Sequence, residues 1–348
     1  MLCVRGRLVA ILGLTAAGAV LAALSLEGAM PALASLLVGL ALVTLSSDPA
    51  VEGFRGLSER TGMSEHMAGI VSSMASNLPE AVLAVFMALS PHLREVAVLT
   101  VMLASAFNGL LLGALVIMLT YRGGRVRVPR EALEHDVEVM RVTIAFSALI
   151  LGAGLILNVF HGRPSLPREI SAFMLASYAG YLYFVSKAAG ERGRSRGSEG
   201  GGWALSLALG LAGILVSAEL ISSAAEFMVR ELGLHVVVAA TVIAFAGSVP
   251  EHFLALVSAK RGHVELGVSN LVSGVVQSVM VILPLLSAVA PLYLDGYVLY
   301  QFLAVASTLW VTKKAIVDDS ALTLDEGVYI MMAHLLGIVL FDELSWLM

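Results

Sequence analysis

The sequence predicts an all-α transmembrane protein with about eleven helices. Of its 348 residues, 58% are hydrophobic and only 14% are charged, whereas a soluble protein contains about 25% charged residues. The apolar residues form runs of about the 20 residues that a helix needs to cross a bilayer. These runs are expected at residues 8–25, 31–58, 66–89, 94–120, 141–160, 168–187, 203–231, 235–259, 264–288, 292–312 and 326–346.

The distribution of basic residues predicts the orientation. Arginines gather in the segment 122–130 and again in 192–196, and two lysines lie at 313–314, each in an alternate connection between spans. Because cytoplasmic loops carry the excess of Lys and Arg, we expect a multi-pass plasma (inner) membrane protein with a cytoplasmic N-terminus and an outside C-terminus. The first apolar run is expected to be a retained signal-anchor helix, since further spans follow it. The single cysteine, Cys3, excludes an internal disulfide.

The chain divides into four regions. The N-terminal helix covers 1–29, the first repeat 30–187, a Gly/Arg/Ser-rich cytoplasmic linker 188–202 and the second repeat 203–348. At an offset of 171 residues the halves align without gaps, and Pro79-Glu80 falls on Pro250-Glu251. Five crossings separate these two segments, so they traverse the membrane in opposite directions. The expected fold is therefore two inverted five-helix repeats plus one extra N-terminal helix, an arrangement typical of secondary transporters.

Two glutamates lie near the middle of predicted spans, Glu80 in the third and Glu251 in the eighth. A carboxylate at mid-membrane costs roughly 2.5–3.5 kcal/mol on insertion scales, so it is kept only with a partner. Two carboxylates brought together by the repeat repel each other unless a cation or protons intervene, and they titrate as a coupled unit. The pair predicts a divalent-cation site. The alternative is a buried pair satisfied by hydrogen bonds alone, which the repetition and the polar neighbours disfavour.

Each glutamate follows a proline that cannot donate to the carbonyl four residues earlier. Both helices are therefore expected to be interrupted, with freed carbonyls lining the site. Oxygen-bearing side chains lie three residues before each glutamate, on the same helix face, and in the spans that follow. Such oxygens form a hard ligand set that suits Ca²⁺. The candidate ion-binding residues are Glu80, Glu251, Asn77, Ser248, Asn108 and Gln277, with weaker candidates Ser76, Ser278, His252, Ser273 and Asn270.

Two histidines need a separate interpretation. His252 is adjacent to Glu251 in the sequence, so it points to another helix face, and a gating or packing role is favoured over a ligand role. His334 in the last span is expected to be a packing residue. The acids Asp48 and Glu219, which the repeat pairs, are expected to be solvated or to line a vestibule.

SNLPE at 76–80 and GSVPEH at 247–252 resemble the paired repeat motifs of the calcium/cation antiporter superfamily. The resemblance implies ten core helices in two inverted halves and alternating access by movement of the second and seventh spans. It also implies exchange of Ca²⁺ for H⁺ or Na⁺. The Glu251-His252 pair and the stretch from Ser273 to Gln277 resemble the cation/proton branch, whereas both prolines are closer to the sodium/calcium branch.

We expect Ca²⁺/H⁺ antiport by mutual exclusion. Ca²⁺ binds when Glu80 and Glu251 are both ionised, and protonation releases it. The alternative is Na⁺/Ca²⁺ exchange. An intramembrane enzyme is disfavoured because no motif such as H-E-x-x-H is present, and a passive channel because this chain carries its own repeat. No cofactor, nucleic acid or obligate protein partner is expected beside the lipid bilayer and the transported ions.

Overall fold

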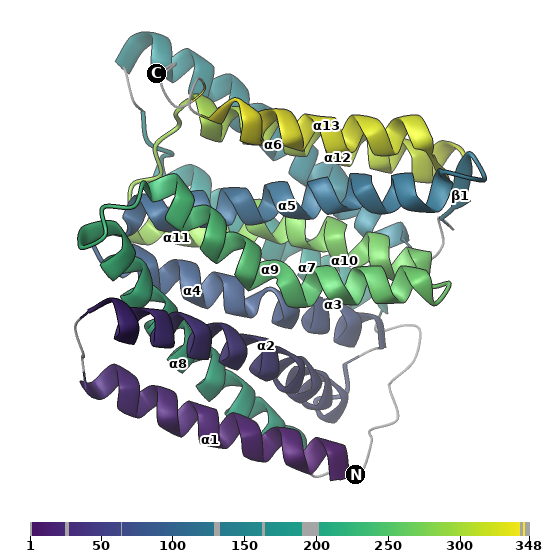
Figure 1. Cartoon of the computed structure of the whole chain (residues 1–348). Coiled ribbons are helices and arrows are strands. Elements are labelled where there is room, and N and C mark those ends of the chain that lie inside the picture. The colour runs from purple at the N-terminus through teal and green to yellow at the C-terminus, as the bar shows by residue number, and fades with distance from the viewer. Residues whose placement is uncertain are drawn as a thin grey trace. The chain divides into compact units, whose positions relative to one another are not determined.

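A computed structural model (Figure 1) describes residues 2–24, 28–63, 65–128, 133–161, 164–189, 202–341 and 344. The described residues form thirteen α-helices, one π-helical turn and two short strands. These elements are α1 (Leu2–Leu24), α2 (Ala29–Arg60), α3 (Glu65–Ser76), α4 (Leu78–Leu89), α5 (Arg94–Thr120), β1 (Arg125–Arg127), α6 (Glu134–His161), α7 (Arg168–Ala189), α8 (Trp203–Arg230), α9 (Val236–Lys260), α10 (Val264–Gln277), η2 (Ser278–Ile282), α11 (Leu283–Val289), α12 (Gly296–Asp318), β2 (Ala321–Thr323) and α13 (Leu324–Val339).

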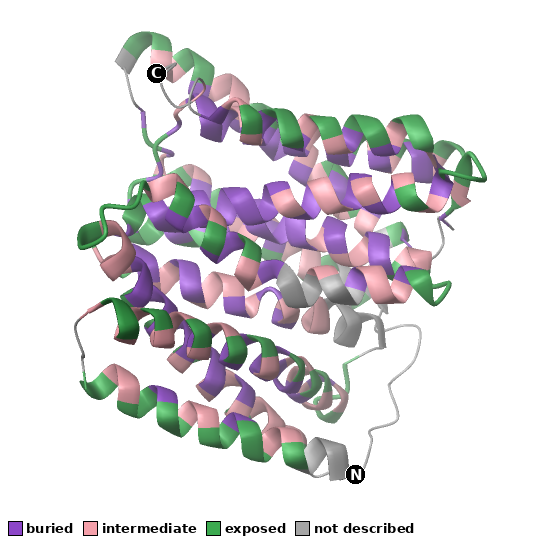
Figure 2. Ribbon diagram, viewed as in Figure 1, coloured by how far each residue is buried: buried purple, intermediate pink, exposed green. Residues whose placement is uncertain are grey.

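The helices have the length and surface of membrane spans. In the described part of the chain, six helical stretches are long and apolar enough to cross a bilayer: Gly6–Leu24, Ala29–Arg60, Arg94–Thr120, Asp136–Phe160, Trp203–Arg230 and Val264–Val289. Much of α1 is exposed, including the large apolar side chains of Val9, Leu12 and Val20 (Figure 2). Apolar surface of this extent indicates contact with lipid. The prediction of a helical membrane protein is confirmed.

Each of the eleven predicted spans corresponds to a helix, but two of them are interrupted. The third consists of α3 and α4, separated at Asn77. The ninth consists of α10 and α11, separated by the π-helical turn η2. Pro284 explains the second interruption, because its ring clashes with the carbonyl four residues earlier and it has no amide hydrogen. The backbone N–H of Leu283 bonds instead to Ser278, five residues back.

The expected interruption at Pro250 is wrong. Helix α9 runs without a break from Val236 to Lys260. One missing backbone hydrogen bond does not end a helix by itself. The Ser248 hydroxyl donates to the carbonyl of Ala244 at 2.8 Å, a bond back to residue i−4 that is compatible with a continuing helix. The predicted linker 188–202 lies mostly outside the described residues, and α7 continues to Ala189.

The chain forms two compact units, and α5, α7 and α9 contribute to both. The first unit comprises Met1–Thr100 and Ser177–Pro250, and the second comprises Val101–Ala176 and Glu251–Met348. In the first unit α1, α2 and α8 pack together, as Figure 1 shows. Glycines bring α2 and α8 into close contact. A Cβ atom at Gly210 would lie 2.5 Å from the backbone nitrogen of Ala50, and one at Gly39 would lie 2.7 Å from Cγ1 of Ile221.

In the second unit α12 packs against α6 and α13. His334 of α13 is fully buried, and its Nε2 lies 3.0 Å from the hydroxyl of Thr308 on α12. The ring occupies the space that a side chain at Gly109 of α5 would need. His334 therefore has the packing role that we expected from the sequence.

Two loop pairings connect distant parts of the second unit. Strand β1 pairs antiparallel with β2, with Val126 opposite Leu322. A separate bridge joins Ser165 to Tyr293. Each pairing joins two segments that the predicted topology also assigns to one side of the membrane. The strands were not predicted, because three residues are too few to show a period of two.

Candidate functional site

The junction between α3 and α4 positions the first group of candidate ligands. Pro79 cannot donate to the carbonyl of Ala75, and the helix ends at Ser76. The Ser76 hydroxyl donates to the Ser73 carbonyl at 2.8 Å, and the Asn77 amide nitrogen donates to the same oxygen at 3.2 Å. These side chains donate to a carbonyl in the last turn of α3, where the following backbone has no amide hydrogen in position to form the helical bond.

Asn77 presents an acceptor oxygen at this junction. The residue is buried, with 4% of its surface exposed, and no donor among the described residues reaches its Oδ1. A buried carbonyl oxygen without a donor is costly unless water or an ion satisfies it. Glu80 follows in the first turn of α4 and is half-buried. A helix N-terminus favours a negative charge at such a position. Asn77 is the N-cap of α4 and Glu80 lies three residues later in its first turn, so the expectation that the two side chains share one face stays a prediction.

The second-repeat counterparts are only partly described. Ser248 is buried, and its hydroxyl donates to the backbone of its own helix, so its oxygen keeps lone pairs that can bind a cation. Glu251 belongs to α9, but its side chain lies outside the described residues. Glu80 and Ser248 belong to the first unit and Glu251 to the second. The meeting of the two glutamates is therefore still a prediction from the sequence.

Residues of three helices come together in the second unit. His252 of α9 and Asn108 of α5 form a hydrogen bond of 3.0 Å between Nε2 and Oδ1. A carbonyl oxygen only accepts, so His252 donates here. Gly274 of α10 lies against the other end of the Asn108 amide, where a Cβ atom would come within 2.5 Å of Nδ2. Asn108 is thus fixed between α9 and α10, and its oxygen keeps a second lone pair.

The remaining candidates lie along α10 and its end. Gln277 is buried, and its amide nitrogen donates to the Ser273 hydroxyl at 2.7 Å. Ser278 is buried and is the first residue of η2. Asn270 is half-buried on the same helix. A π-helical turn next to candidate ligands is notable, because such turns occur frequently at functional sites.

The sequence interpretation missed two features of this cluster. It did not pair His252 with Asn108, which is 144 residues away. It also passed over Ser105, which is buried three residues before Asn108 and whose hydroxyl finds no partner among the described residues. The i, i+3 spacing of Ser105 and Asn108 was a signal that could have identified it.

The donor set is mixed in character. In the described part of the chain, no three His, Cys, Asp or Glu side chains gather as a preformed metal cluster. The oxygens that are present come from amides, hydroxyls and single carboxylates. Such hard oxygens suit Ca²⁺ or Na⁺ rather than a transition metal.

A family profile matches the chain twice, over residues 31–187 and 202–348, and its description is sodium/calcium exchanger protein. The chain belongs to this family. The two matches cover the regions that contain the two Pro-Glu motifs, and α1 lies outside them. No curated protein sequence matches the chain.

Solved exchanger structures share the fold of this family member. A crystal structure of the H⁺/Ca²⁺ exchanger CAX gives a TM-score of 0.73 at 16% identity, over 97% of this chain and 88% of that one. The sodium-calcium exchanger NCX_Mj soaked with 100 mM Na⁺ and 10 mM Sr²⁺ gives 0.60 at 20% identity, over 88% and 97%. At these identities the similarity establishes the fold.

Replacement of Asn108 by alanine tests the cluster. Loss of an amide oxygen from a cation site, and of the partner of His252, is expected to raise the half-saturating cation concentration about tenfold. The measurement is cation uptake by reconstituted vesicles over a concentration series. Asn158→Ala is the matched control, because this asparagine donates to the carbonyls of Gly154 and Leu294. It is expected to lower thermal stability without a change in half-saturation, and an equal shift in both variants would contradict the assignment.

Proposed function

We propose that the chain is a secondary active antiporter that exchanges Ca²⁺ for H⁺ by alternating access. Glu80 and Glu251 would hold the ion, with Asn77, Ser248, Asn108 and Gln277 as further oxygen ligands. The observation that carries the proposal is the α3–α4 junction. There, a buried acceptor oxygen of Asn77 without a donor among the described residues directly precedes the helix turn that contains Glu80.

Contacts between α2 and α8 support the inverted repeat on which this proposal depends. Gly39 meets Ile221, and Ala50 meets Gly210. At the offset of 171, Gly39 corresponds to Gly210 and Ala50 to Ile221. Each contact is therefore the counterpart of the other, as expected when a local two-fold axis relates two helices. Inverted-repeat transporters bind their substrates near the membrane midplane at the interface of the repeats.

The counter-ion is proposed to be H⁺ for two reasons. The resemblance to the sodium/calcium branch implies an acid where Ser278 stands, and this serine, which is fully buried, weakens a site for several sodium ions. His252, a group that can exchange a proton, is adjacent to Glu251 and bonded to the proposed ligand Asn108. Na⁺/Ca²⁺ exchange is the alternative. The prolines at 79 and 250 favour it, because they resemble the sodium/calcium branch, and so does Asn108, which keeps a polar position that this branch has in its first repeat.

Vesicles containing the purified protein test the proposal. We expect Ca²⁺ uptake when an outward-directed proton gradient is imposed, and its loss when an ionophore collapses the gradient. Uptake driven by a sodium gradient alone would contradict proton coupling and establish the alternative. Absence of uptake under both gradients would contradict antiport of Ca²⁺.

The membrane arrangement is part of the proposal. An inner-membrane location, a cytoplasmic N-terminus and an outside C-terminus follow from the basic segments. They are testable by labelling of single cysteines introduced into the Arg122–Arg130 segment and the Ser165 loop, which are expected to react from opposite sides. Labelling of both from one side would contradict the topology. Cys3 must be replaced first, since it is the single native cysteine.

A further inference from the structure

Helix α2 contains a proline in its interior. Pro49 lies in the interior of this helix, which runs from Ala29 to Arg60, and it is buried. Proline has no amide hydrogen, so the carbonyl of Leu45, four residues earlier, loses its helical donor. In a membrane span an unsatisfied carbonyl is costly, because lipid offers no hydrogen bond in exchange.

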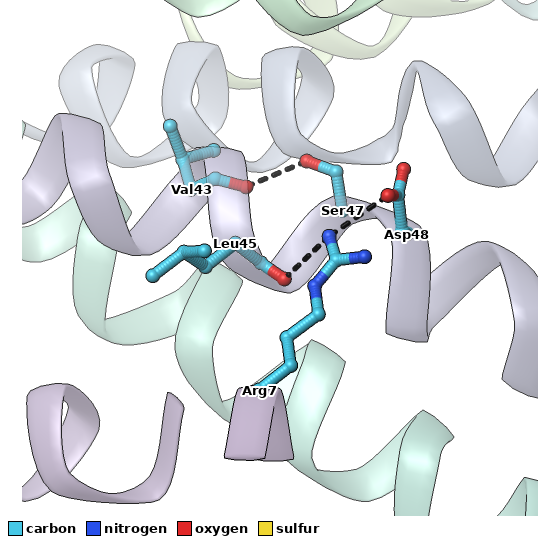
Figure 3. Close-up of polar contacts among 5 residues, drawn as sticks. All are labelled: Arg7, Val43, Leu45, Ser47 and Asp48. Carbon is cyan, nitrogen blue, oxygen red and sulfur yellow. Dashed lines mark hydrogen bonds and ion pairs between the residues drawn. The ribbon is translucent and has the colours of Figure 1, made fainter. Parts of the chain in front are cut away.

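Arg7 of α1 supplies the missing donor. Its Nη2 donates to the Leu45 carbonyl at 3.2 Å and lies 2.8 Å from Oδ2 of Asp48 (Figure 3). Ser47 adds a hydroxyl bond to the Val43 carbonyl at 2.6 Å in the same turn. One guanidinium thus satisfies the proline-freed carbonyl and neutralises the acid next to the proline. Charge-assisted hydrogen bonds of this kind are stronger than neutral ones.

The second repeat has no need of this contact. At the offset of 171, Leu220 of α8 takes the place of Pro49 and keeps its amide hydrogen. Glu219 takes the place of Asp48 and is exposed, whereas Arg7 of α1 pairs with Asp48. Helix α1 meets α8 through packing instead, because a Cβ atom at Gly18 would lie 3.0 Å from Cδ1 of Leu220. The polar contact of α1 is therefore specific to the helix that contains the proline.

Helix α8 packs on α2 next to Pro49. A Cβ atom at Gly210 would lie 2.5 Å from the nitrogen of Ala50, the residue after Pro49. The proline site is thus held by a side chain from α1 and by the backbone of α8. The three helices form one packed group in the first unit.

We propose that Arg7 is a positioning residue of the transport cycle, which replaces the amide hydrogen that Pro49 lacks and thereby makes α1, α2 and α8 move as one group. The proposal rests on the proposed antiport, in which α2 and α8 change position. Without Arg7, the residues of α2 after Pro49 move independently of those before it. Turnover then falls, whereas the ion ligands and their affinity stay the same.

Full-length protein in vesicles tests this, with Ca²⁺ uptake driven by whichever gradient supports transport in the wild type. Arg7→Gln is expected to lower the maximal rate about tenfold and to leave the half-saturating Ca²⁺ concentration within about twofold. Arg7→Lys keeps the charge and is expected to restore part of the rate. Arg55→Gln is the matched control, since Arg55 lies on α2 and pairs only with Glu59 in its own helix among the described contacts. It is expected to behave as the wild type.

Pro49→Ala provides the decisive comparison. An alanine amide donates to the Leu45 carbonyl itself, so the double variant Arg7→Gln/Pro49→Ala is expected to regain the rate of Pro49→Ala alone. Hydrogen–deuterium exchange of residues 46–60 gives a readout independent of transport. It is expected to be faster in Arg7→Gln and restored in the double variant.

The outcomes separate this proposal from the proposed function. If the wild type transports nothing, the antiport proposal fails. The comparison of hydrogen–deuterium exchange between the wild type and Arg7→Gln still decides whether Arg7 holds α2 in position. Equal rates and equal exchange in the wild type and Arg7→Gln overturn the positioning role. The role is also overturned if Arg7→Gln has a defect that the added Pro49→Ala does not correct. The defect can be in the transport rate, in hydrogen–deuterium exchange or in the accumulation of folded protein.

Discussion

Replacement of Glu80 by glutamine is expected to abolish Ca²⁺ transport. Glutamine keeps the size of the side chain and one carbonyl oxygen but removes the negative charge from the first turn of α4. In the proposed site the partner of this carboxylate is the bound cation, and loss of one partner from such an ion pair costs about 3–5 kcal/mol when the pair is buried, which corresponds to at least ~100-fold in affinity. The measurement is the initial rate of Ca²⁺ uptake in vesicles under the gradient that drives the wild type.

A structural role for Glu80 gives a different result. If the glutamate only stabilises the fold, Glu80→Gln lowers the melting temperature and leaves residual transport in proportion to the folded protein. If it holds the ion, the melting temperature without Ca²⁺ is unchanged or raised, because removing charge from water opposes folding. Glu95→Gln is the matched control: Glu95 also lies in the first turn of an apolar helix but is exposed. Transport at the wild-type rate by Glu80→Gln would remove this residue from the site.

The spans could be predicted from the sequence because their signal is local. Apolar runs of about 20 residues fix the positions of helices such as α5, whose predicted and observed limits coincide at 94 and 120. The same logic failed where two segments with one motif fold differently. Asn77 of the first motif and Ser248 of the second both donate to the carbonyl four residues back. The helix nevertheless ends at Ser76 in the first motif and continues to Lys260 in the second.

The residues of the candidate site could be named from the sequence, but the contacts among them could not. Polar stripes along the spans that follow the two motifs identified Asn108 and Gln277, and both are buried. The bond between His252 and Asn108 depends on the packing of α9 against α5. No pattern within either segment contains that information. The π-helical turn at Ser278 was predictable in principle, because Pro284 stands at the position that disturbs the helix.

Packing between α2 and α8 shows how small residues support the proposed mechanism. Two helices in lipid associate through close contact rather than through a hydrophobic driving force, and glycine permits the closest approach. Gly53 of α2 meets the backbone of Leu207 of α8 in the same way that Gly210 meets Ala50, whereas Gly56 meets the side chain of Trp203. We expect two helices in such close backbone contact to move as a pair, as the proposed alternating access by α2 and α8 requires.

Gly210→Val is therefore expected to prevent the correct packing of α2 on α8. Its new Cβ atom would lie 2.5 Å from the nitrogen and 2.8 Å from the Cα of Ala50, and backbone atoms cannot rotate away. Overpacking of a core costs about 1–3 kcal/mol when side chains can adjust, so we expect a loss of at least about 3 kcal/mol here. The measurements are accumulation of monodisperse protein in detergent and its melting temperature. Gly152→Val is the control, because no atom lies within 4 Å of a Cβ atom at that position.

Gly39 is the counterpart of Gly210 in the first repeat. A comparison of variants at the two positions shows whether a clash with backbone, or only the loss of a glycine, destabilises the protein. A Cβ atom at Gly39 would lie 3.2 Å from the backbone oxygen of Ser217, and its shortest contact, at 2.7 Å, would be with Cγ1 of the Ile221 side chain. That side chain can change rotamer, at a cost of the order of 1 kcal/mol. Gly39→Val is therefore expected to be milder than Gly210→Val, although the two glycines correspond in the repeat. Equal destabilisation by both variants would show that the spacing of the helices, rather than the Ala50 backbone, limits their approach.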